Sequence, residues 1–263
     1  MKNLEHIKKA TPYQDINDVL YFLAQGIERI LGANLVGLYL TGSLSYGDFE
    51  EGRSDIDLAV ILQEQGSPED TALERQLHLD VERHYEKWAR RIECSYIPLN
   101  MLQDILPPKS PRPYAGGGTF YPEAPYGNEW LINQYFLHKD SIALMGPDFK
   151  TLIKPVHIAD VQEACIRDLH EEWEPKITDP AYLQDSHQQS YVVLNLCRIL
   201  HTVMCNDAVS KRVAASWVER EYPQWRDLIE AAENWHYGVK MDREGEVIEF
   251  IRFAITRVQE RTK

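Results

Sequence analysis

The sequence predicts an α+β N-terminal domain followed by an all-helical C-terminal domain. Three short, apolar and β-prone runs lie within residues 35–98, and helical patterns lie before and between them. Residues 106–125 then form a Pro/Gly-rich stretch without periodicity, and beyond it nearly every apolar pattern repeats at helical spacing. A chain of 263 residues is long enough for two domains, which we place at 1–156 and 157–263.

The elements of the N-terminal domain follow from local patterns. Helical spacing predicts a helix over 13–31, with Asp15 or Asn17 able to cap it. The runs LVGLYLTG and SDIDLAVIL are short, apolar and β-prone, so each predicts a buried strand. After a helix over about 69–90, the alternating segment IECSYIPL predicts a third strand. The Pro/Gly-rich stretch 106–125 is expected to be a long loop near the domain boundary.

The C-terminal domain is expected to contain helices alone. Its apolar residues recur at helical spacing, strands are scarcely indicated, and no internal repeat is present. The predicted helices of this part, together with one that precedes it, cover residues 128–145, 159–173, 188–205, 210–219, 224–236 and 245–261.

Composition and charge restrict the class of protein. Hydrophobic residues make up 44% and charged residues 26%, as in soluble globular proteins, and no apolar run is long enough to span a membrane. We therefore expect a cytoplasmic protein, acting as a monomer. Its four cysteines show no pairing typical of disulfides or zinc sites. The formal net charge of −13 argues against a nucleic-acid partner and favours a cationic ligand.

Two aspartates stand at the start of the second predicted strand. Residues two apart in a strand point to the same face, so Asp55 and Asp57 are expected to project together. Two neighbouring carboxylates repel each other unless a cation or a proton relieves the repulsion, and a hard divalent ion such as Mg²⁺ is suited to that role. The alternative is a solvated strand end without function.

Two further features strengthen the functional interpretation. Gly42 and Ser43 end the first predicted strand, where glycine lets the backbone approach closely and free N–H groups with one hydroxyl can bind phosphate. Glu93 lies in the third predicted strand. If that strand lies beside the second, its carboxylate joins the aspartates as a further metal ligand or as a general base.

This combination resembles the nucleotidyltransferase superfamily of the DNA polymerase β type. Gly42-Ser43, then Ser54-Asp55-Ile56-Asp57, then a later strand carboxylate is the pattern of that superfamily. The resemblance implies a mixed sheet flanked by helices, Mg²⁺ held by the carboxylates, and a nucleoside triphosphate donor. It also implies that an acceptor hydroxyl attacks the α-phosphate in line and that pyrophosphate leaves.

The second half resembles a narrower family, the aminoglycoside adenylyltransferases that act on streptomycin and spectinomycin. The similarity lies in residues 140–156, 191–203 and 210–223. It implies transfer of AMP from ATP to an antibiotic hydroxyl, and hence antibiotic resistance. Carried over by position, it places the following residues near the nucleotide and metal: Ser43 and Ser54 at the triphosphate, Asp55 and Asp57 as metal ligands, Glu93 as ligand and catalytic base, and Arg198 and Lys211 at the ATP phosphates.

Residues at the acceptor are carried over less directly. Trp173 matches a family tryptophan beside the drug, although its position also suits a helix core. Asp179 and Asp185 are approximate counterparts of acidic family residues, because the linker here is longer. Phe120 and Tyr121 stand where the family has a tryptophan that contacts the substrate, which points to a different compound.

Other functions stay open at the level of sequence. The same chemistry could transfer a nucleotide to a protein or to another metabolite. The scaffold could also serve as a non-catalytic binding protein or an antitoxin-like module. The clustered carboxylates argue against a non-catalytic module, because a site without catalysis has no need to keep them.

Overall fold

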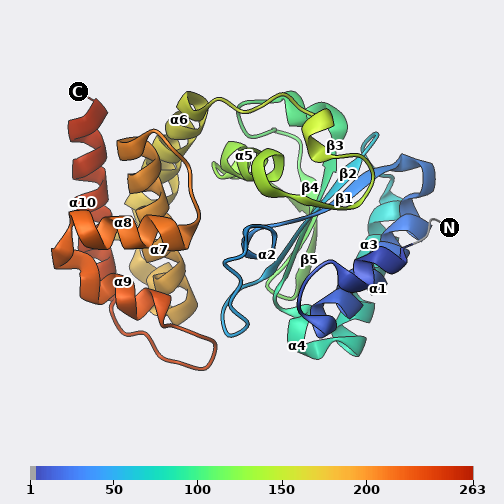
Figure 1. Ribbon diagram of the computed structural model, residues 1–263, viewed down its shortest axis with the longest axis horizontal. Helices are drawn as coiled ribbons and strands as arrows, with labels where there is room; N and C mark the ends of the chain where they lie inside the picture. The colour runs from blue at the N-terminus through green and yellow to red at the C-terminus, as the bar shows by residue number, and fades with distance from the viewer. Residues whose placement is uncertain (1–3, 263) are drawn as a thin grey trace. The chain divides into compact units, whose positions relative to one another are not determined.

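The computed structural model describes residues 4–262, and the chain divides into two compact units (Figure 1). The first unit comprises Met1–Phe49, Ser54–Tyr126 and Gln134–Pro155, and the second comprises Glu50–Arg53, Gly127–Asn133 and Val156–Lys263. Two short segments of the N-terminal half therefore group with the C-terminal unit. A single domain boundary at 156/157 stays a prediction.

The first unit is built on a six-stranded mixed sheet with the order β5-β4-β3-β2-β1-β6. Strands β2 and β3 run parallel, and each of the other neighbouring pairs is antiparallel. The strands are β1 (Leu35–Thr41), β2 (Ile56–Leu62), β3 (Ile92–Pro98), β4 (Arg112–Gly116), β5 (Thr119–Ala124) and β6 (Ile142–Met145). The three strands expected from the sequence are confirmed as β1, β2 and β3.

One face of this sheet packs against helices α1 (Gln14–Leu31) and α3 (Pro68–His84), which lie side by side (Figure 1). Alternate residues of the central strands join the helices in one apolar cluster, among them Leu40, Leu58 and Cys94. Because side chains alternate between faces along a strand, Asp57 and Glu93 must lie on the opposite face.

That opposite face is closed at one end and open at the other. Along β2, Ile61 and Ala59 are buried, whereas Asp57 is only half-buried. On β1, Tyr39 is buried against Phe149 with ring centroids 5.1 Å apart, and its hydroxyl donates to the Pro147 carbonyl at 2.8 Å. The polar end of the face is therefore the end at which β2 and β3 begin.

The start of α1 differs from the expectation. Neither Asp15 nor Asn17 caps the helix, and its N-cap position is Tyr13, without a side-chain capping bond. Asn17 instead exchanges hydrogen bonds with the backbone and hydroxyl of Thr11. Asp15 accepts hydrogen bonds from Lys87 and from the indole of Trp88. Both side chains fix neighbouring segments rather than the helix end.

Two predicted helices are divided in the structure. The helix expected over 69–90 is α3 followed by α4 (Glu86–Ala89), with Tyr85 between them outside helical geometry. The helix expected over 128–145 is α5 (Trp130–Asp140) followed by strand β6. The short apolar run of β6 is compatible with a helix or a strand, and the structure shows it as a strand that pairs with β1.

The segment expected as a loop over 106–125 contains a β-hairpin. Strands β4 and β5 pair across it, and the turn between them places Gly117 and Gly118 at φ +59° and +79°. Positive φ is the conformation that such tight turns require and that glycine tolerates, so these glycines form the turn of the hairpin.

Among its described residues the second unit contains helices, turns and loops but no strand, as the sequence predicts. The helix α7 packs against α6, α8, α9 and α10 and is buried over most of its surface. The helices are α6 (Ile158–Asp168), α7 (Ser186–Cys205), α8 (Lys211–Glu221), α9 (Arg226–Glu233) and α10 (Glu244–Thr262), with a π-helical turn at Leu169–Trp173. Within residues 4–262, no helix is long and apolar enough to cross a membrane.

Candidate active site

Strand register places two carboxylates side by side. Asp57 pairs with Thr41 of β1 on one side and with Glu93 of β3 on the other. Directly paired residues of neighbouring strands point to the same face, and such strands lie about 4.8 Å apart. Asp57 and Glu93 therefore form one polar row across the centre of the sheet, as the sequence predicted for adjacent strands.

Asp55 lies just before the strand and has a different environment. The first residue of β2 is Ile56. The sequence predicted Asp55 within this strand, and the structure places it one residue before the strand begins. Arg91 Nε lies 3.7 Å from Asp55 Oδ1, and the same guanidinium donates to the Ser54 carbonyl and lies over the ring of Trp88 at 4.6 Å. The largely buried Arg91 holds the Ser54-Asp55 segment in place.

Gly42 forms the turn between β1 and the short helix α2 (Ser43–Tyr46). Its φ is +63°, a region that favours glycine, and a Cβ added there would lie 1.8 Å from Asp57 Oδ2. The backbone thus approaches the Asp57 carboxylate more closely than a side chain at this position would allow. The expected sequence of strand, glycine turn and short helix is confirmed, and Ser43 begins that helix.

Tyr114 of β4 is a site residue that the sequence analysis missed. Burial, together with the nearby carboxylates of Glu93 and Asp57, raises the pKa of Tyr114 far above its ordinary value. Its ring stacks on Tyr121 at 6.3 Å, and the Arg112 guanidinium lies 5.2 Å from the ring centroid. Pro113 interrupts the segment Arg112–Gly116, so the sequence carries no clear local signal for this strand.

The two aromatic residues of β5 lie on opposite faces. Tyr121 pairs with Tyr114 and is 47% exposed, so it belongs to the carboxylate face. Phe120 pairs with Ala115 and stacks on His78 of α3 at 5.6 Å. Of the two candidate acceptor-binding residues, only Tyr121 lies on the same face of the sheet as the carboxylates. Phe120 lies on the opposite face, which packs against helix α3.

The carboxylate row fits a cation that takes part of its coordination from phosphate. No group of three or more His, Cys, Asp or Glu side chains in the described part of the chain is arranged to hold a metal ion by itself. Mg²⁺ is commonly bound through one or two protein carboxylates together with phosphate oxygens and water. Asp57 and Glu93 supply two hard oxygen donors in this arrangement.

Two predicted site residues of the second unit, Lys211 and Trp173, lie against Tyr191. Lys211 Nζ lies 4.0 Å from the centroid of the Tyr191 ring, and Trp173 lies 6.1 Å from the same ring. Trp173 is only 4% exposed, and its indole N–H donates to Asp168 at 2.8 Å. Arg198 donates to Asn195 on its own helix. The Trp173 ring is thus mainly a core residue.

The two acidic candidates are exposed and occupy helix starts. Asp185 is the N-cap of α7 and accepts from the Gln188 N–H at 3.0 Å. Asp179 precedes a 3₁₀ turn and accepts from the Ala181 N–H at 3.5 Å. Each capping bond uses one carboxylate oxygen, so the second oxygen of each side chain can accept from another group.

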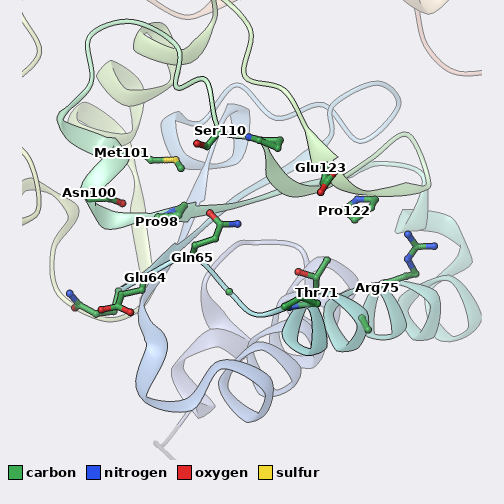
Figure 2. A pocket seen from close by; sticks show the side chains of 15 residues that line it. Glu64, Gln65, Thr71, Arg75, Pro98, Asn100, Met101, Ser110, Pro122 and Glu123 are labelled. Atoms are coloured by element: carbon green, nitrogen blue, oxygen red, sulfur yellow. The ribbon is translucent and has the colours of Figure 1, made fainter.

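A cavity of about 1020 Å³ lies elsewhere on the first unit (Figure 2). Its lining includes Gln63 and Pro98, at the ends of β2 and β3 that are remote from the carboxylates, and Arg75 of α3. Asp57 and Gln63 are six residues apart on one strand, which corresponds to about 20 Å. The cavity and the carboxylate row are therefore separate features.

Comparison with known proteins agrees with this geometry. Residues 23–111 match the nucleotidyltransferase domain family, and residues 151–257 match the C-terminal domain of the aminoglycoside adenylyltransferases. A spectinomycin 9-adenylyltransferase of Campylobacter jejuni is 23% identical over 94% of this chain and 95% of that protein. One from Staphylococcus aureus is 27% identical over 73% of each chain.

A solved structure shares the fold. The crystal structure of spectinomycin adenyltransferase from Enterococcus faecialis with ATP and spectinomycin aligns with a TM-score of 0.71 at 19% identity, over 92% of this chain and 98% of that chain. The two family matches together cover most of the sequence, and the first of them contains the whole carboxylate row. The chain is therefore a nucleotidyltransferase with the two-domain organisation of the aminoglycoside adenylyltransferases.

Proposed function

We propose that the protein transfers AMP from ATP to a hydroxyl group of a spectinomycin-like aminocyclitol or aminoglycoside and releases pyrophosphate. The observation that carries the proposal is the pairing of Asp57 with Glu93 beside the Gly42 turn, in a chain that is similar to a spectinomycin 9-adenylyltransferase over 95% of that protein's length.

Asp57 and Glu93 would hold Mg²⁺, with Asp55 as a third carboxylate two residues before Asp57. A bound Mg²⁺ would neutralise charge on the triphosphate and on the leaving pyrophosphate. The Gly42-Ser43 turn and Ser54 would lie against the phosphates, since glycine allows close approach of backbone N–H groups. We also propose that Arg198 and Lys211 bind ATP phosphates.

The proton of the acceptor hydroxyl would pass to Glu93. As the hydroxyl oxygen bonds to the α-phosphorus, the bond from that phosphorus to the bridging oxygen of the β-phosphate breaks, and pyrophosphate carries away that electron pair. Glu93 is exposed at the open end of the sheet face, so its carboxylate is accessible to a bound sugar. Holding the hydroxyl in line with the phosphorus supplies much of the remaining rate enhancement.

The acceptor is proposed to be a cation. The chain has a formal net charge of −13, and an acidic protein attracts cationic ligands over polyanions such as nucleic acids. Asp179 and Asp185 offer carboxylates for ammonium groups. The exposed Tyr121 offers an aromatic surface, which attracts cations and packs against sugar rings.

The direct test is pyrophosphate release by the purified protein with ATP, MgCl₂ and a panel of aminocyclitols and aminoglycosides. We expect release with at least one spectinomycin-like compound, and mass spectrometry should find one added AMP on that compound. The reaction should stop on addition of EDTA and resume with excess Mg²⁺. Absence of pyrophosphate release with every compound would contradict the proposed acceptor class.

A further inference from the structure

Tyr114 lies on the carboxylate face, two residues along the ladder from Glu93. Its partner across β3 and β4 is Ser95, and the next pair along the ladder is Cys94 with Ala115. Continuing the same register sets Gly116 opposite Glu93. Tyr114 is then the diagonal neighbour of Glu93 on one face, a separation that an aromatic side chain can bridge.

The missing side chain of Gly116 lets Tyr114 reach Glu93. A Cβ built on Gly116 would lie 2.5 Å from the Tyr114 hydroxyl and 2.6 Å from two atoms of its ring. The ring therefore lies over Gly116, in the space directly opposite Glu93, close enough for the Glu93 carboxylate to raise the pKa of the Tyr114 hydroxyl. The tyrosine occupies the volume that a side chain at position 116 would fill.

The ring is also held from its other sides. Tyr121 stacks on it, with an interplanar angle of 21°. Arg112 lies over the ring, and its guanidinium is fixed in turn by hydrogen bonds to the Ser95 hydroxyl and the Pro125 carbonyl. These contacts restrict the direction in which the Tyr114 hydroxyl points.

We infer that Tyr114 is a positioning residue for Glu93, whose carboxylate it orients so that one oxygen accepts the proton of the acceptor hydroxyl. The inference rests on the proposed role of Glu93 as the base. A hydrogen bond from the tyrosine hydroxyl to one Glu93 oxygen would fix the direction of the other oxygen. A displacement of about 1 Å at a reacting group costs on the order of 100-fold in rate, so such orientation has a measurable effect.

The chain supplies a matched control in Tyr39. This tyrosine lies on the same sheet face and covers Gly37 in the same way, with its hydroxyl 2.4 Å from an added Cβ, but it donates to the Pro147 carbonyl instead of a carboxylate. Y39F and Y114F each remove one hydroxyl from a tyrosine that covers a glycine. Only Y114F removes a contact to Glu93.

The kinetic test measures kcat and KM for ATP in both variants. We expect Y114F to lower kcat by about 10-fold to 100-fold with KM for ATP unchanged, the effect of losing one hydrogen bond to a charged group. Y39F should leave kcat within about 2-fold of the wild type. Unchanged kcat in Y114F, or equal losses in the two variants, would overturn the inference.

A second variant acts on the same contact without removing the hydroxyl. G116A should push the Tyr114 ring away and lower kcat as Y114F does, and the double variant should be no slower than the slower single variant, because both changes remove one contact. Additive losses would overturn the inference.

Crystal structures of the wild type and Y114F test the orientation without reference to turnover. We expect a single Glu93 conformer in the wild type and several in Y114F. One identical Glu93 conformer in both would overturn the inference. A wild type that shows this contact but adenylylates no compound would instead contradict the proposed function.

Discussion

Gly42 makes the close approach between the phosphate turn and Asp57 testable at a single residue. A methyl group there would overlap the Asp57 carboxylate, with 1.8 Å between the added Cβ and Oδ2, so we expect G42A to displace that carboxylate and to lower kcat by about 100-fold or more. Steady-state pyrophosphate release measures this change.

Gly32 separates this clash from backbone strain. Its φ of +50° and ψ of −116° lie outside the left-handed helical region, as do the φ of +63° and ψ of −157° of Gly42, but nothing lies within 4 Å of its added Cβ. G32A should therefore share the loss of stability from backbone strain and keep most of the activity. Equal losses of activity in the two variants would show that strain, and not the contact with Asp57, is responsible.

Glu74 is a buried carboxyl group away from the site, and it makes stability depend on pH. It is 1% exposed, neither oxygen has a hydrogen-bond partner within the described residues, and burial with the nearby Asp70 raises its pKa from 4.5 to about 7. Tyr96 and Cys94 of β3 lie close enough for their own pKa values to respond to it.

The sign of the effect follows from linkage. Between pH 4.5 and 7 the folded state holds this proton more tightly than the unfolded state does, so the contribution of Glu74 to stability falls as pH rises through that range. Urea unfolding should show the wild type losing about 2 kcal/mol relative to E74Q between pH 5.5 and 8. A constant difference between the two proteins would contradict this assignment.

The start of α7 allows capping to be separated from acceptor binding. Asparagine caps helices as well as aspartate does, whereas alanine costs about 1 kcal/mol. D185A should therefore lower the free energy of unfolding, while D185N keeps it. If Asp185 also contacts a cationic acceptor, D185N should raise the KM for that acceptor several-fold at unchanged stability. An unchanged KM in D185N would reduce Asp185 to a capping residue.

The sequence predicted the elements whose patterns are local and unbroken. Strands β1, β2 and β3 and the helices of the second unit each carry a clear apolar period, and the Gly42, Asp57 and Glu93 positions follow from those strands. The β4–β5 hairpin was missed because prolines interrupt its pattern. Pro122 lies in the edge strand β5, and Pro113 lies where the β4–β5 register shifts, which are places where strands tolerate proline.

Register explains the site residues that the sequence could not identify. Whether Phe120 or Tyr121 faces the carboxylates depends on how β4 pairs with β3 and β5, and a shift of one residue would exchange them. Tyr114 reaches Glu93 for the same reason. Asp55 was predicted within the strand, but the ladder begins one residue later.

The net charge of the whole chain is expected to affect the binding of the acceptor more than the rate of the chemical step. A net charge of −13 attracts a cationic acceptor through a field that salt screens, since the Debye length falls from about 10 Å at 0.1 M to about 3 Å at 1 M. Raising KCl from 0.1 to 0.5 M should therefore increase the KM for the acceptor several-fold and change kcat little. An acceptor KM that does not change with salt would contradict this electrostatic role.

The central claim is that Asp57 and Glu93, paired across β2 and β3, form the catalytic centre of adenylyl transfer. It is tested most directly by pyrophosphate release in E93Q, with ATP binding measured by calorimetry on the same preparation. The account predicts that turnover falls by about 1000-fold or more while the affinity for ATP stays within a few-fold of the wild type. Turnover in E93Q at the wild-type rate would contradict it.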